Sequence, residues 1–186
     1  MIHYYSNREC AKKLEVNLAR WKRWSRSFLA PDPLGGLQSG FSRQYTFKDL
    51  VKVYVGGHLL SHLKLSVAES QQVVADITPW LKKSGFLEIN GPGSDTCRIA
   101  CRIYFSRRTL PAGTRGSQFI YWVRQTIARE ALAGATGVRM HEVYEETCIG
   151  CEPGGDAKFF ERPDVYLLNL SAVFSRMVEK LRSAPV

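Results

Sequence analysis

Four helix starts within the first 70 residues constrain this chain more than its composition does. The segments 6–9 and 66–69 are S-x-x-E capping boxes, in which a hydroxyl and a carboxylate satisfy free backbone amides at a helix start. Asn17 is placed to cap a second helix, and Thr46 opens a third. The pattern therefore predicts helices over about 6–14, 18–28, 46–63 and 66–77.

Glycine and proline mark the breaks around these helices. The polar, glycine-rich segment from Leu34 to Tyr45 predicts a short β-hairpin between the second and third helices. Gly56 and Gly57 lie inside the third helix, where each costs about 1 kcal/mol relative to alanine, so they indicate close packing or a bend. Pro79 is expected to stop or kink the fourth helix.

The positive charge is concentrated in the N-terminal part of the chain. The formal net charge is +9, with 13 Lys/Arg against 6 Asp/Glu in residues 1–83 and 13 against 11 in residues 84–186. Such an excess is expected of a surface that faces a polyanion, and equally of a merely soluble basic surface. The second helix interleaves basic residues with Trp21, which we assign to the core, and Trp24, for which core and backbone-contact roles remain open.

After residue 83 the pattern changes to mixed α and β structure. Cys97–Phe105 alternates as a half-buried strand, and 138–146 and 165–170 are also expected to be strands. We expect a helix from Ser117 to Gly134, with a strand over 118–123 as the alternative, and a closing helix over 170–182. These expectations give two domains, 1–83 and 84–186.

The order of elements in the first domain resembles the MerR family of transcription regulators. The likeness covers about residues 4–78 and is carried by Ser6–Ala11, Val16-Asn17, Lys22–Trp24, Pro33, Gly40–Thr46, Asp49-Leu50 and Leu65–Glu69. Three features depart from the family's pattern, and one of them is a slightly longer hairpin. Phe28 stands where the family usually has glycine, and no sustained heptad follows the head to form a long dimerisation helix.

The resemblance implies an all-α winged helix-turn-helix head that binds double-stranded DNA, followed by a small α+β domain for effector binding or oligomerisation. In the family the second helix enters the major groove, and a basic residue, a phosphate-contacting aromatic and wing residues contact DNA; Lys22, Trp24, Arg43 and Tyr45 match them by position. The resemblance and the charge pattern together predict the DNA-binding set Asn17, Arg20, Lys22, Arg23, Trp24, Arg26, Arg43 and Tyr45. We expect a homodimer.

Two further groups of residues admit a chemical role. A cationic, apolar effector would fit a site formed by Trp122, Tyr144 and Glu145. The alternative is that the aromatic rings belong to the hydrophobic core of the domain, which is the more common role of such residues. Cys148 and Cys151 form a CxxC that is a weak candidate for zinc or redox chemistry. His58 and His62 lie four apart without the glutamate of an HExxH motif.

Several function classes are disfavoured. No P-loop, dinucleotide fingerprint, nucleophile elbow or paired-carboxylate motif is present, so we expect neither catalytic residues nor a cofactor. No stretch approaches the roughly 20 apolar residues of a membrane span, and the N-terminus lacks a signal-peptide core, which predicts a cytoplasmic protein. The expected function is DNA-binding transcriptional regulation. The alternatives are an excisionase- or phage-type accessory protein and a thiol- or zinc-dependent redox sensor.

Overall fold

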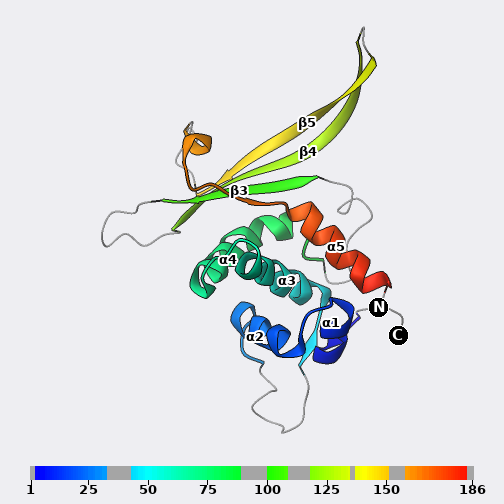
Figure 1. Cartoon of the computed structure of the whole chain (residues 1–186), viewed down its shortest axis with the longest axis vertical. Helices are drawn as coiled ribbons and strands as arrows, with labels where there is room; N and C mark the ends of the chain where they lie inside the picture. The colour runs from blue at the N-terminus through cyan, green and yellow to red at the C-terminus, as the bar shows by residue number, and fades with distance from the viewer. Residues whose placement is uncertain are drawn as a thin grey trace. The chain divides into compact units, whose positions relative to one another are not determined.

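The structure is a computed structural model that describes residues 3–32, 43–88, 100–108, 118–134, 137–150 and 158–183, with the backbone alone described for 129–134 and 137–141. The chain divides into two compact units. One unit comprises Met1–Cys97 together with Ala172–Val186, and the other comprises Arg98–Ser171. Figure 1 traces both units along the chain.

The first unit combines helices with a small sheet. Its described elements are β1 (Tyr5–Ser6), α1 (Asn7–Lys13), α2 (Leu18–Phe28), β2 (Gln44–Tyr45), α3 (Phe47–Ser61), α4 (Val67–Lys83) and most of α5 (Leu170–Ser183). The expected all-α head is therefore wrong. Strands β1 and β2 pair antiparallel, with Tyr5 opposite Tyr45, because the chain leading into α3 returns beside the segment that precedes α1. The hairpin expected from Leu34 lies largely outside the described residues.

The predicted helix starts are confirmed at atomic detail. The Ser6 amide donates to Glu9 Oε2 at 2.6 Å, and the Glu9 amide donates to Ser6 Oγ at 3.3 Å. The same reciprocal bonds open α4 at Ser66, and Thr46 forms a third capping box with Asp49. Helix α4 runs through Pro79 to Lys83, so the proline does not stop it.

Helix α2 rests on α3 through two aromatic rings and two glycines. A Cβ atom built on Gly57 would lie 2.3 Å from Trp24 Cε3, and one built on Gly56 would lie 2.6 Å from the Phe28 ring. Both distances are far below van der Waals contact, so only glycine leaves room for these rings. Of the two roles expected for the glycine pair, the structure therefore shows close packing.

The C-terminal helix belongs to the first unit, although it follows the whole second unit in sequence. Phe174 on α5 packs edge-on against Phe47 of α3 at 5.9 Å and against Phe86 at 5.0 Å between ring centroids. Lys180 forms an ion pair with Glu15. The division expected at residue 83 assigned this helix to the second domain; its apolar face instead packs on the first unit.

The described residues of the second unit form a four-stranded antiparallel sheet in the order β5-β4-β3-β6. Its elements are β3 (Cys101–Arg107), β4 (Phe119–Gly134), β5 (Gly137–Ile149), the 3-10 turn η1 (Phe159–Glu161) and β6 (Tyr166–Leu168). β3 pairs with β4 only from Phe119 to Gln125, so the rest of β4 pairs with β5 alone and continues as the two-stranded ribbon seen in Figure 1. The alternating strand expected to end at Phe105 and the strands expected over 138–146 and 165–170 are confirmed.

The helix expected from Ser117 to Gly134 is wrong, since this segment is strand β4. Phe119, Tyr121 and Val123, at alternate positions, are the most deeply buried residues of the segment, which fits the period of a strand, although Ile120 is also buried. Ile127, which would have completed the helical face, is 60% exposed. The strand considered as the alternative over 118–123 is the structure that forms, and it is longer than expected.

Replacing Gly57 with alanine tests the contact between α2 and α3, because the sign of the resulting change in stability depends on that contact. At an unconstrained helix position alanine is more favourable than glycine by about 1 kcal/mol. Here the added methyl group meets the Trp24 ring, and overpacking of this kind costs about 1–3 kcal/mol. We therefore expect Gly57→Ala to lower the free energy of unfolding measured by urea denaturation.

The control repeats the Gly57→Ala exchange in a Trp24→Leu background, where the smaller side chain leaves space for the methyl group. The loss should shrink there, which gives a coupling energy between the two positions. An increase in stability on Gly57→Ala in the wild-type background would contradict the close packing.

Candidate nucleic-acid interface

Helix α2 separates its residues into a packed side and a basic side. Trp21 and Ser25 are buried, and Trp24 and Phe28 are half-buried. At about 100° per residue, the remaining basic positions form one continuous arc of about 160° around the helix. All four side chains on this arc are exposed: Arg20, Lys22, Arg23 and Arg26.

The basic arc carries unneutralised charge. None of its four side chains forms an ion pair with a carboxylate in the described part of the chain, and α2 has no acidic residue in its first turn. The Arg26 Nε donates to the Lys22 carbonyl at 3.1 Å, which holds the guanidinium along the helix surface. The arc can therefore accept an external polyanion without first breaking an ion pair.

A tight turn and a side-chain cap set the start of α2. Glu15 adopts the left-handed backbone conformation with φ of 54°, and the Val16 amide donates to the Ala11 carbonyl at 3.0 Å. Asn17 Oδ1 then accepts from the amides of Ala19 at 2.9 Å and Arg20 at 3.3 Å. The Asn17 carbonyl oxygen is thus used in capping, and only the exposed Asn17 amide nitrogen remains to donate to a ligand.

The packing of α2 on α3 determines the position of the Trp24 ring, which does not belong to the basic arc. Its ring lies on the backbone of Gly57, and the side chain as a whole is half-buried. The core role left open for Trp24 is the one that these contacts support. Sequence reasoning left the choice open because the glycine that receives the ring lies on another helix, although the Gly56-Gly57 pair indicated close packing or a bend.

Arg43 and Tyr45, the expected wing contacts, have different environments. Tyr45 is buried, and its hydroxyl donates to Asn7 Oδ1 at 2.8 Å and lies 3.1 Å from Ser25 Oγ. Its ring also meets Trp21 edge-on at 5.5 Å. Tyr45 therefore connects β2 to α1 and α2. It supports α2 from its packed side, opposite the basic arc. Arg43 is half-buried, with its guanidinium 5.7 Å from the centre of the Tyr45 ring.

The structure places two of the three residues considered for an effector on the same face of the sheet. Trp122 and Tyr144 lie on the sheet face that also carries Arg124, whereas Glu145 is opposite Gln125 and points to the other face. The Arg124 guanidinium lies 4.4 Å from the centre of the Tyr144 ring and is paired with Glu146 at 2.7 Å. The Arg124 guanidinium thus lies against the Tyr144 ring, where a cationic effector was expected to bind. Sequence reasoning considered Glu146 as one of the carboxylates near Tyr144 but missed Arg124, which strand alternation would have indicated.

The cysteines offer little metal or thiol chemistry in the described regions. Cys148 is disulfide-bonded, and Cys151 lies outside the described residues. Cys10 and Cys101 are free and buried, and burial raises the pKa of Cys101 to about 12, so this thiol stays protonated. Across the described ranges, no group of three or more His, Cys, Asp or Glu side chains is arranged to hold a metal ion.

Comparison with known proteins adds no relative to this picture. No protein-family model matches the chain, and no curated protein matches it significantly. Among the described helices, none combines the length and the apolar character needed to cross a bilayer.

Removal of the Tyr45 hydroxyl tests whether Tyr45 supports α2 from its packed side. Tyr45→Phe leaves the ring in place but removes the contacts with Asn7 and Ser25, so we expect a loss of about 0.5–1.5 kcal/mol in the free energy of unfolding in urea. Tyr4→Phe is the matched control, because Tyr4 is 53% exposed, and its stability should not change. Equal stability of Tyr45→Phe and the wild type would show that the hydroxyl contacts contribute nothing.

Proposed function

We propose that this protein is a DNA-binding transcriptional regulator with a head like that of the MerR family, acting as a cytoplasmic homodimer. The observation that carries the proposal is the exposed arc of four basic side chains on α2 that have no ion-pair partner among the described residues. Helix α2 follows α1 after a short turn, which is the order of a helix-turn-helix whose second helix enters the major groove. The sequence resemblance and the geometry point to the same helix.

The basic arc supports binding in two ways. Lys and Arg side chains that neutralise backbone phosphates release counterions, which gives affinity for any duplex and makes it depend on salt. Arginine and lysine also bond the O6 and N7 atoms of guanine in the major groove, which gives sequence preference. We assign phosphate contacts to Arg23 and Arg26 and base contacts to Lys22, with Arg43 contacting the adjacent backbone.

The packing of α2 supports specificity as well as affinity. A reading helix discriminates bases only if its side chains are held in register with the groove. The Trp24 and Phe28 rings on Gly57 and Gly56 prevent α2 from sliding or rolling on α3, and the Tyr45 hydroxyl joins the N-terminal end of α1 to α2. Because this packing already fixes α2 before DNA binds, less conformational entropy is lost on binding.

The salt dependence of binding tests the proposal. We expect the full chain to bind a duplex with an affinity that falls as salt rises, and Arg23→Ala/Arg26→Ala to reduce the slope of log K against log salt by about two units, since each phosphate contact contributes about 0.9. Fluorescence anisotropy of a labelled duplex measures this slope.

The matched control is Lys82→Ala/Lys83→Ala, which removes two exposed charges at the end of α4 and so changes the net charge equally. This control should leave the slope unchanged. A slope reduced equally by both pairs would mean that overall charge, and not the face of α2, binds DNA.

A further inference from the structure

A cavity of about 370 Å³ lies within the first unit and shares Arg20 with the exposed arc of α2. Its walls come from the turn between α1 and α2, from α2 itself, from the C-terminal half of α3 and from α5. Val173, Arg176 and Lys180 reach it from α5, at positions that lie on one side of a helix. The volume is that of a small-molecule site.

The cavity gathers positive and ionisable nitrogen groups from three helices. Arg20 comes from α2, His58 and His62 from α3, and Arg176 and Lys180 from α5. Glu15 is the one carboxylate among the lining residues, and it is already paired with Lys180 at 2.5 Å. Arg20 and Arg176 have no ion-pair partner among the described residues, so the lining carries uncompensated positive charge.

The two histidines face this charge as a stacked pair. Their ring centroids are 4.3 Å apart, and the ring planes differ by 16°. The Ser61 hydroxyl donates to the Gly57 carbonyl at 2.6 Å and lies 3.0 Å from His62 Nδ1. Burial, together with His62 and Arg176, lowers the pKa of His58 to about 4, so this imidazole is neutral at pH 7. Protonating His58 would place a positive charge beside His62 and Arg176, and a bound anion would offset that unfavourable interaction.

The remaining walls are apolar or aromatic. Trp24 and Tyr54 present rings, and Leu14, Val16 and Val173 present aliphatic surface. A ligand that fits both kinds of wall carries a negative group and a flat apolar body. A bare inorganic ion would leave the apolar surface uncovered.

We propose that this cavity binds a small organic anion, a carboxylate or a phosphate ester on a planar apolar body. The guanidinium groups of Arg20 and Arg176 hold the anionic group from two sides, because the planar guanidinium fits both oxyanions. The His58 ring binds it as an N–H donor, and the rings of Trp24 and Tyr54 contact the body of the ligand.

The site also connects with DNA binding, and this part rests on the proposed function. Arg20 belongs both to the cavity lining and to the edge of the basic arc on α2. A bound anion engages the Arg20 guanidinium and withdraws its charge from the arc that would face DNA, so ligand and DNA oppose each other. Anion binding itself needs no DNA and is tested without it.

The test uses the full chain without DNA and two probes, benzoate and phenyl phosphate, which separate carboxylate from phosphate ester. Benzyl alcohol and benzylamine are the neutral and cationic controls. Affinity is measured by calorimetric titration, and the His58 ring is followed by NMR. We expect at least one anion to bind and to shift the His58 ring signals, and neither control to bind.

The pH dependence has a defined sign. A bound anion favours protonated His58 and raises the pKa of that imidazole above its value in the free chain, where His62 and Arg176 oppose the proton. The other charged lining residues are the cations Arg20 and Lys180 and the carboxylate Glu15. Binding therefore takes up a proton, and the affinity for benzoate, which stays ionised, should increase as the pH falls from 7.5 to 5.5.

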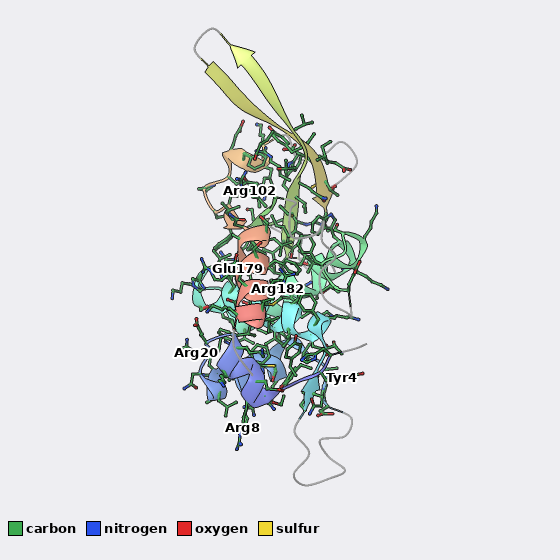
Figure 2. The ribbon with its side chains drawn as sticks, turned by 90° about the vertical axis from the view of Figure 1, so that its right-hand side faces the viewer. Tyr4, Arg8, Arg20, Arg102, Glu179 and Arg182 are labelled. Carbon is green, nitrogen blue, oxygen red and sulfur yellow. The ribbon has the colours of Figure 1, made fainter. Side chains whose placement is uncertain are left out.

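The variants compare two exposed arginines of the same helix. Arg176→Glu removes a cation from the cavity lining, whereas Arg182→Glu makes the same charge change at a residue, labelled in Figure 2, that does not line the cavity. We expect Arg176→Glu to weaken binding by roughly tenfold or more and Arg182→Glu to leave it within about twofold. Arg176→Glu should also raise the pKa of His58 in the free chain, which reports on the cavity even before a ligand is added.

Three outcomes would overturn the proposal. The first is the absence of binding by both anions, and the second is an equal loss of affinity in the two variants. The third is a shift of the His58 signals by a short DNA duplex but not by either probe, which would make the cavity part of the DNA backbone contact. Failure of DNA binding with intact benzoate or phenyl phosphate binding would overturn only the proposed function.

Discussion

The contact of two aromatic rings of α2 with two glycines of α3 determines how these two helices pack in the first unit. Trp24 and Phe28, one turn apart on α2, lie on Gly57 and Gly56 of α3 at distances that no Cβ atom would permit. Because this side of α2 is committed to packing, the basic residues that remain are collected on the opposite side. The same contact thus determines which side chains a polyanion meets, and Trp24 also forms part of the wall of the cavity behind α2.

The proposed DNA surface and the proposed anion site share one helix but use different faces of it. Arg23 and Arg26 lie well inside the exposed arc, whereas Arg20 is at its edge and lines the cavity with Arg176 of α5. Helix α5 is joined to the turn before α2 by the Lys180–Glu15 ion pair and by the bond from Lys180 to the Leu14 carbonyl, 3.3 Å long. The C-terminal helix is therefore a structural part of the N-terminal unit, and it is where a ligand would act on α2.

Local signals allowed a large part of the fold to be predicted. Capping at Ser6, Asn17 and Ser66 depends on residues within one helical turn, so the helix starts could be derived from spacing alone. The role of Trp24, the burial of Tyr45 and the docking of α5 depend on partners far away in the sequence, and no local pattern contains them. The segment from Phe119 was misassigned because its apolar residues match a helical face as well as a strand, and pairing with β3 and β5 decides the outcome.

The most direct measurement of whether α2 reads DNA is selection of bound sequences from a pool of random duplexes by the full chain. We expect recovery of a short common sequence arranged as an inverted repeat, since a homodimer presents two copies of α2 related by a two-fold axis. Recovery of no common sequence, with binding no stronger than to arbitrary duplex, would contradict sequence reading by α2.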